Sequence, residues 1–337
     1  MKRLKQVIWL VIAIGAAVLA GIFLYRELHN MTLDQFMHDI TSIPLHRYLL
    51  ALLSTAVAYF ALAWYDRIAL IHLGIHHIRW MFVSLCSFTT YALAHNIGFS
   101  VFSGALVRYR AYSAKGLSTT QIAILVALCS YTFALGVIIL CGIIFTFQPE
   151  IIAHFQFSPD SPIQLPRFLA DPYFARFLGL GLLAFAAIYV IGSLMHLRPL
   201  RIKRFVLEYP KPAVMLRQLI AGPLELLGAA GIIYFALPEA WNPGYVTVLT
   251  VFLVSFSIAL VSNVPGGYGV FEAVFFAAMP GLEDAQKSQV FAALVVFRLF
   301  YLLIPLVFSA IIILLYERAQ FKKKNQETNA DNLNKTL

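Results

Sequence analysis

Charged residues and cysteines are both scarce in this chain. Only 12% of its 337 residues are Asp, Glu, Lys or Arg, about half the share found in soluble domains, and 61% are hydrophobic. Cys86, Cys129 and Cys141 all lie in apolar segments, where they pack as small side chains rather than form disulfides or bind a metal. The chain also lacks zinc-binding, paired-carboxylate and nucleophile motifs, so we expect no enzyme activity and no cofactor.

The sequence instead contains long apolar runs. They are long enough to cross a bilayer as helices, which predicts an all-α polytopic membrane protein. Residues 1–320 should form one membrane domain and residues 321–337 a disordered cytoplasmic tail. The first apolar run follows Lys2, Arg3 and Lys5, so a cleaved secretory signal is the alternative to a first span. The eight apolar segments are 7–25, 48–71, 80–102, 121–147, 177–195, 214–237, 245–262 and 289–316.

Basic residues orient these segments. The excess of 25 Lys and Arg over 16 Asp and Glu falls between segments and at the ends of the chain, so topology explains it better than nucleic-acid binding. Both termini are expected in the cytoplasm. The basic positions that should be cytoplasmic are Arg79, Arg108, Arg110, Lys115, the five Lys and Arg residues of 198–211, and the tail from Arg318 to Lys324.

Simple alternation of spans cannot satisfy this orientation. The third segment begins beside Arg79 and is followed at once by Arg108 and Arg110, so the chain must dip into the membrane and return. A second return is required between residues 262 and 289. Polar, glycine-rich breaks lie at both places, 95–104 and 264–269. We therefore predict two re-entrant hairpins that enter from opposite faces, a pattern that inverted repeats typically produce.

Two further segments border the membrane. Thr32 and Gln35 match a capping box before an amphipathic stretch, which predicts a short helix on the outer membrane surface. The basic segment 196–212 is expected either against the cytoplasmic leaflet or as a plain loop.

Ionisable residues inside spans are candidates for function because each is costly unless it is paired or hydrated. Glu272 follows the second break and Arg298 lies in the last span, so the two are expected to pair. The pair is either purely structural, or Arg298 binds an anionic headgroup through its two-pronged guanidinium while Glu272 holds it in place. Asn263, Gly266 and Gly267 at the break are candidates for the same site.

Two other carboxylates lie within spans. Asp66 is adjacent to Arg67 near the inner end of the second segment, and the two are interpreted as a pair at the membrane interface. Glu225 is central in the sixth segment, with Gln218 two turns before it. It is either a proton-sensitive carboxylate or a partner in a hydrogen bond between helices.

The first break supplies His95, Asn96 and Ser100, followed by Arg108 and Arg110. The two arginines beside a polar hairpin suggest an entrance for phosphate from the cytoplasmic leaflet, although the positive-inside rule explains them equally well. His95 is expected to be neutral and bonded to backbone at the break, with titration near neutral pH as the alternative.

At these breaks the sequence resembles a known family. The run from Ala94 to Arg110, with Tyr112 and Gly116-Leu117-Ser118, and the run Ser262-Asn263-Val264-Pro265-Gly266-Gly267-Tyr268-Gly269-Val270-Phe271-Glu272 are similar to the membrane region of the lysylphosphatidylglycerol synthase and flippase family, the multiple peptide resistance factor. The resemblance extends from about residue 10 to residue 316. It implies a lipid-flipping domain with two re-entrant hairpins. Members that make lysyl-lipid carry a further aminoacyl transferase domain, and the short polar tail here leads us to expect no lipid synthesis.

The predicted function is translocation of an anionic glycerophospholipid across the bacterial inner membrane. One alternative is a proton-coupled transporter of a small anionic solute that uses Glu225 or Glu272. Another is a non-transporting partner of a lipid-synthesising enzyme. The spans are rich in Gly and Ala, which suits both internal packing and a homo-oligomer.

Overall fold

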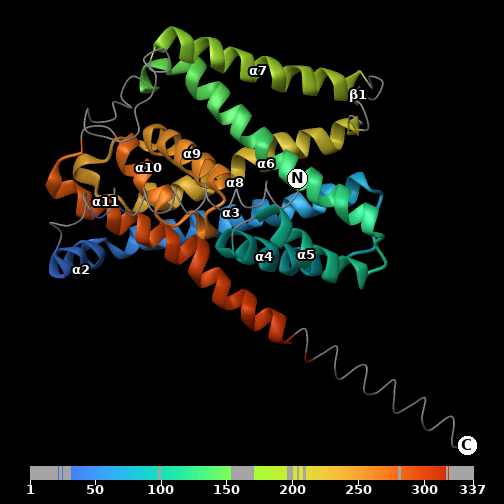
Figure 1. The fold of residues 1–337 in the computed structure, drawn as a ribbon, viewed down its shortest axis with the longest axis horizontal. Coiled ribbons are helices and arrows are strands. Elements are labelled where there is room, and N and C mark those ends of the chain that lie inside the picture. Colours follow the sequence, from blue (N-terminus) through green and yellow to red (C-terminus); the bar gives the residue numbers. More distant parts are fainter. Residues whose placement is uncertain are drawn as a thin grey trace, which may run out of the picture.

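A computed structural model describes residues 22, 25, 32–97, 100–152, 171–195, 200–202, 205–207, 210–279, 282–315 and 318. Within these residues, six helices are long and apolar enough to cross a membrane, and they form one elongated bundle (Figure 1). These spans are Leu45–His72, Thr119–Phe147, Pro172–Leu194, Pro212–Ala236, Tyr245–Ser262 and Gln286–Leu315.

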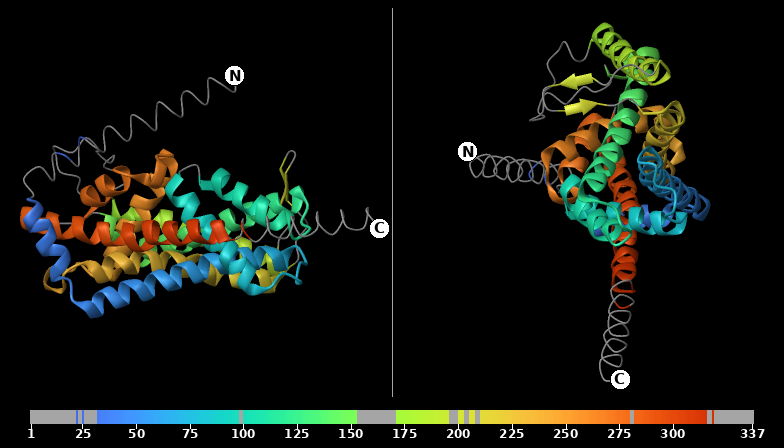
Figure 2. Two further views of the ribbon diagram at one scale, coloured as in Figure 1. Left: turned by 90° about the horizontal axis from the view of Figure 1, so that it is seen from below. Right: turned by 90° about the vertical axis from the view of Figure 1, so that its right-hand side faces the viewer.

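The predicted all-α membrane fold is confirmed. The elements of the first half are α2 (Leu33–Ser42), α3 (Leu45–His72), α4 (Trp80–Ile97), α5 (Ser100–Ser113), α6 (Thr119–Phe147), η1 (Pro149–Ile152) and α7 (Pro172–Leu194). A short antiparallel pair, β1 (Leu200–Ile202) and β2 (Phe205–Leu207), then joins α7 to the next span (Figure 2). The second half contains α8 (Pro212–Ala236), η3 (Glu239–Trp241), α9 (Tyr245–Ser262), η4 (Pro265–Gly267), α10 (Val270–Ala278), α11 (Asp284–Phe297) and the π-helical turn η5 (Arg298–Leu303).

The six spans belong to the described residues alone, so the predicted count of eight segments stays a prediction. The third predicted segment is divided into α4 and α5, since the helix stops at Ile97 and a new one starts at Ser100. Segment 7–25 lies almost entirely outside the described residues, and the tail 321–337 lies wholly outside them. The basic segment contains the two short strands, whose side chains are not described.

Capping explains where two helices begin. The Thr32 side chain accepts a hydrogen bond from the Gln35 backbone N–H at 3.2 Å, so one half of the predicted capping box is present at α2. Ser118 and Gln121 form the complete reciprocal box at the start of α6. The α2 helix packs on α11, where Phe36 lies 5.6 Å from Phe291 between ring centroids.

The two predicted hairpins are both present. The α5 helix folds back along α4, and α10 folds back along α9. The hairpins occupy opposite ends of the bundle, and their tips meet near its middle, where α4 touches η4 (Figure 1). Figure 2 shows the same separation from a perpendicular direction. The interrupted ends of both hairpins therefore contact protein, and backbone groups without a helical partner need such contacts or water within a bilayer.

The tip of the second hairpin depends on unusual backbone conformations. Asn263 ends α9 in the left-handed region at φ 54°, and Gly266 and Gly267 follow with φ of 60° each. A Cβ on Gly267 would lie 2.9 Å from the Cβ of Ala259. Glycine is therefore required here both for the backbone angle and for the close approach to α9.

Glycines also set the distances at the centre of the bundle. The α8 helix packs along α3 and α6. A Cβ on Gly136 would lie 2.5 Å from the carbonyl carbon of Gly222, and one on Gly228 would lie 2.8 Å from the Ala58 backbone nitrogen. The backbones of α8 and its two neighbours are thus in direct contact, as small residues permit between membrane helices.

Candidate functional site

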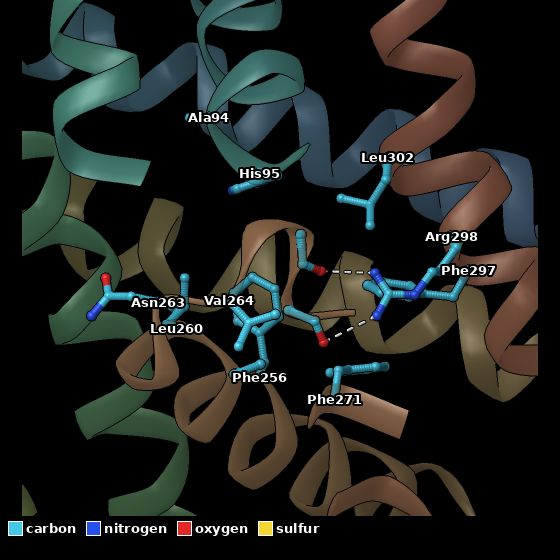
Figure 3. Close-up of a pocket in the computed structure, with 13 residues that line it drawn as sticks. Ala94, His95, Phe256, Leu260, Asn263, Val264, Phe271, Phe297, Arg298 and Leu302 are labelled. Carbon is cyan, nitrogen blue, oxygen red and sulfur yellow. Dashed lines mark hydrogen bonds between the residues drawn. The ribbon is translucent and has the colours of Figure 1, made fainter. Parts of the chain in front are cut away.

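The two hairpin tips face one another across a small cavity of about 50 Å³ (Figure 3). His95 approaches from the end of α4, Asn263 from the end of α9, and Arg298 from the last span. Segments far apart in the sequence therefore converge at the point where both helices are broken. Broken helices that meet at the midplane are the usual setting for a transport site.

Arg298 and Glu272 form the predicted ion pair. Arg298 Nε donates to Glu272 Oε1, and both side chains are buried. Glu272 Oε2 accepts a second bond from the Gly269 backbone N–H at 2.9 Å, so both of its oxygens are engaged. The pairing is confirmed, while a role for either residue toward a ligand stays a prediction.

Arg298 also fixes the tip of the second hairpin. Its Nη1 donates to the Gly266 carbonyl at 2.8 Å and its Nη2 to the Gly267 carbonyl at 3.3 Å, the two dashed bonds of Figure 3. The guanidinium lies 4.1 Å from the centroid of the Tyr268 ring. The predicted site residues Gly266 and Gly267 thus bind Arg298 through their carbonyl groups.

The turn that carries Arg298 is π-helical, with Tyr301 in the same turn. Tyr59 on α3 donates to the Tyr301 carbonyl at 2.9 Å, and Asn96 on α4 donates to the Leu302 carbonyl at 3.1 Å. A π turn leaves backbone carbonyls out of the regular α-helical pattern, and here side chains from two neighbouring helices bind them. Asn96, predicted as a binding residue, connects the first hairpin to the last span.

A larger cavity of about 310 Å³ adjoins the hairpin tips and shares His95 and Asn263 with the smaller one. It lies among α3, α4, α5, α6, α8 and α9. Its polar lining residues are Tyr91, His95, Arg108, Cys129, Ser130, Glu225 and Asn263. The rest of the lining is apolar, and a cavity of this size that contains ionisable side chains inside a bundle of membrane helices is a candidate binding site.

Glu225 lines this cavity from the middle of α8 and is 1% exposed. Its Oε1 accepts a bond from the Tyr301 hydroxyl at 2.5 Å. Its Oε2 is buried and has no hydrogen-bond partner among the described residues. Gln218, considered above as a neighbour of Glu225, instead binds Thr132 and Tyr189.

The interpretation of Asp66 and Arg67 as a pair at the interface is wrong. Asp66 is fully buried and accepts two-pronged hydrogen bonds from Arg108, with Nη2 2.6 Å from Oδ1 and Nε 3.2 Å from both oxygens. Tyr112 also donates to Asp66 at 2.9 Å. Arg67 donates to the Ile78 carbonyl. Adjacent residues on a helix point about 100° apart, so the partner of Asp66 comes from another helix.

Arg108 and Arg110 do not form one shared entrance. Arg108 lines the 310 Å³ cavity, whereas the exposed Arg110 lines a separate apolar groove of about 580 Å³ between the first hairpin and residues 312–315. Ser100 begins α5, and its side chain is not among those described.

His95 does not have the predicted backbone bond. Its Nδ1 is buried and has no hydrogen-bond partner among the described residues, and its ring stacks on that of Tyr301 with centroids 5.3 Å apart. The described residues also contain no cluster of His, Cys, Asp and Glu suited to a metal ion.

Comparison with known proteins now decides the family. The family described as the lysylphosphatidylglycerol synthase TM region matches residues 8–309. The chain belongs to this family.

Two other proteins are similar to this chain over most of their length. The protein slr0712 of Synechocystis sp. is 28% identical over 319 residues, which cover 94% of each chain. The inner membrane protein YbhN of Escherichia coli K12 is 33% identical over 277 residues, which cover 81% of each chain. The resemblance found at the two hairpin breaks is therefore confirmed across nearly the whole membrane domain.

Two residues of the site were not predicted from the sequence. Tyr301 connects Glu225, His95 and the π-helical turn, and Tyr112 completes the shell around Asp66. Both are tyrosines inside apolar segments. A hydroxyl at membrane depth needs a hydrogen-bond partner, so a search for buried tyrosines would have marked them.

Proposed function

We propose that the protein is a phospholipid translocase of the bacterial cytoplasmic membrane and that its cargo is an anionic glycerophospholipid. The observation that carries this proposal is the 310 Å³ cavity, which contains Arg108 in a mainly apolar lining and lies beside the hairpin tips. The proposed mechanism involves no covalent step. The family match supports a role connected with membrane lipid, and the name of the E. coli relative supports the location.

The cavity opens toward the side of the bundle. Two of its lining residues, Ser130 on α6 and Val261 on α9, are exposed, and Val261 is 68% exposed. The cavity therefore reaches the surface between α6 and α9, both of which are membrane spans. A lateral opening of this kind suits a lipid because the headgroup can enter the polar cavity while the acyl chains stay in the bilayer. A water-soluble solute gains nothing from it.

Arg108 is the candidate ligand for the phosphate. Asp66 is bound through Nε and Nη2 of Arg108, and a guanidinium has five N–H donors in all. The group thus keeps donor capacity for a second anion. His95 also lines this cavity, and its Nδ1 has no partner among the described residues.

The hairpin tips form the barrier that the headgroup must pass. Arg298 holds the second tip through the Gly266 and Gly267 carbonyls, and Asn96 holds the first tip to the last span. For the headgroup to pass, Arg298 and Asn96 must give up these bonds for other partners. In this mechanism a phosphate that replaces the two carbonyls on Arg298 would release the second tip while the charge of Arg298 stays neutralised.

Reconstitution in liposomes tests the proposal. Phosphatidylglycerol labelled on one acyl chain keeps its native headgroup, and a membrane-impermeant reductant removes fluorescence from the outer leaflet only. Liposomes with the wild-type protein should lose the protected inner pool. Arg108→Gln and Arg298→Gln should retain it, and Arg176→Gln on the exposed surface of α7 is the matched control.

A protected pool that persists with folded wild-type protein would contradict translocation. The experiment should then be repeated with a trapped anionic solute and with candidate lipid-synthesising partners. Those results distinguish the solute transporter and the recruiting partner from a translocase.

A further inference from the structure

The cavity contains a carboxylate whose charge is not balanced. Both arginines near the site have a carboxylate of their own, Asp66 for Arg108 and Glu272 for Arg298. Glu225 has no cationic partner among the described residues, and its Oε2 is buried without a hydrogen bond. An ionised carboxylate in this position is costly at membrane depth.

The same carboxylate faces the space proposed for the headgroup. Glu225 and Arg108 line one cavity of about 310 Å³, so an anionic phosphate on Arg108 shares that cavity with Glu225. Two anions in one low-dielectric cavity repel one another strongly. A protonated Glu225 has no charge and offers an O–H donor to the phosphate.

We infer that the anionic headgroup and one proton bind together, with Glu225 Oε2 as the proton site. This inference rests on the proposed lipid cargo and adds its energy coupling. A hydronium ion that reaches the cavity gives its proton to Oε2 and leaves as water. The cavity then takes up the headgroup with no net change in charge. When the headgroup leaves on the other side, Glu225 returns the proton to water there, so one proton crosses with each lipid and the proton gradient drives the direction of lipid movement.

The other carboxylates are poor proton sites by the same geometry. Glu272 uses one oxygen for Arg298 and the other for the Gly269 N–H. Asp66 accepts bonds from Arg108 and Tyr112. Every carboxylate oxygen at these two positions has a donor that stabilises the ionised form. Glu225 Oε2 has no hydrogen bond from the described residues, and the neighbouring Tyr65 hydroxyl donates instead to the Gly222 carbonyl.

Tyr301 connects the proton site to the hairpin tips. It donates to Glu225 Oε1, stacks on His95 of the first tip, and lies in the same π-helical turn as Arg298. A hydrogen bond to an ionised carboxylate is stronger than one to the neutral acid. Proton binding therefore weakens the bond that holds Tyr301 of the last span to Glu225, beside its contact with the first tip.

Proton binding at Glu225 must be distinguished by experiment from proton binding at other titratable groups nearby. These groups are Tyr59 and Tyr65 on α3, Tyr91 and His95 on α4, Arg108 on α5, Cys129 on α6 and Tyr301 on η5. Among them His95 titrates nearest to neutral pH as a free side chain. It is therefore the main rival as the proton acceptor, and His95→Gln is an essential control.

Calorimetry with a short-chain lipid measures the coupling directly. Dihexanoyl phosphatidylglycerol is titrated into the purified full-length protein in buffers with different ionisation enthalpies, which gives the number of protons taken up. Wild type should take up about one proton for each lipid bound, and its affinity should fall by up to about tenfold for each pH unit where Glu225 loses its proton. Glu225→Gln should bind the lipid with no proton uptake and no such pH dependence.

The variants separate the possible outcomes. Glu225→Asp and the exposed-site control Glu150→Gln should both keep the proton uptake. A proton count near zero for wild type overturns the inference even if Glu225→Gln does not fold. Uptake that survives in Glu225→Gln and disappears in His95→Gln also overturns it. If the wild-type protein neither binds nor translocates the lipid, the proposed function fails, whereas binding without proton uptake contradicts only the coupling.

Discussion

Asp66 on α3 and Arg108 on α5 form a buried two-pronged ion pair, with Arg108 Nη2 2.6 Å from Asp66 Oδ1. Glu272 on α10 and Arg298 on the last span form the corresponding contact for the second hairpin. In each case the returning arm of a hairpin is held to a neighbouring span by one buried charge pair. The signs are reversed, since the first arm carries the arginine and the second carries the glutamate. The partner span precedes the first hairpin in the sequence and follows the second.

Removal of one partner of the Asp66–Arg108 pair should destabilise the protein. Asp66→Asn leaves Arg108 buried without its counter-charge, and we expect a loss of about 3–5 kcal/mol in the free energy of unfolding. Thermal unfolding in detergent measures it. In the double variant Asp66→Asn with Arg108→Gln the loss should be smaller than the sum of the two single losses. Arg67→Gln is the control, and an equal loss there would support the interface pair instead.

Close packing between α6 and α8 should not tolerate a methyl group. A Cβ on Gly136 would lie 2.5 Å from backbone atoms of Gly222, so Gly136→Ala must push the two helices apart. We expect a loss of about 1–3 kcal/mol, the usual cost of overpacking. Gly181→Ala on α7 has open space around its Cβ and should keep the wild-type melting temperature. Equal stability of the two variants would contradict the close approach.

The tip of the second hairpin gives a functional prediction. Gly267→Ala introduces strain at φ 60° and a clash with Ala259, and it displaces a carbonyl that Arg298 binds. We expect lipid translocation to fall at least tenfold, measured as loss of the protected inner-leaflet pool.

Gly74→Ala is the control for Gly267→Ala, because it introduces the same kind of backbone strain far from the hairpin tips. Gly74 has φ 73° and no atom within 4 Å of a built Cβ. It should lose about 1 kcal/mol of stability from the backbone strain and keep its translocation rate. A comparable loss of rate at Gly74 would show that strain alone is responsible.

The proposed orientation is testable with impermeant thiol reagents. Cys86, Cys129 and Cys141 are first replaced by serine or alanine, and single cysteines are placed at the exposed residues Lys115 and Glu239. Lys115→Cys should react only when the reagent has access to the cytoplasmic side, and Glu239→Cys only from the other side. Reaction of Lys115→Cys from outside in intact cells would reverse the topology.

Much of the fold follows from patterns that one segment contains. Apolar length predicted the spans, and the positive-inside rule together with Pro265, Gly266 and Gly267 predicted the second hairpin. The conflict between Arg79 and Arg108 predicted the first. These features are local, so periodicity and charge are sufficient to find them.

The site required knowledge of contacts between segments. Glu272 and Arg298 were paired correctly because few charges in the second half of the chain lie at membrane depth. Asp66 had a nearer candidate in Arg67, and only the packing of α5 against α4 and α6, which brings Arg108 to α3, shows that Arg108 is its partner. The lateral cavity also arises from how α6, α8 and α9 pack, which no single segment encodes.

The π-helical turn sets the rotational phase of the last span. One extra residue in a turn rotates every later side chain by about 100° compared with an unbroken α-helix. Arg298 and Tyr301 can therefore point at the hairpin tips, while Ile312 and Leu315 border the groove beside α4 and α5. One continuous helix thus serves two sets of neighbours. Deletion of a single residue within Arg298–Leu303 would preserve every hydrophobic amino acid after it and still turn all of them to the wrong side.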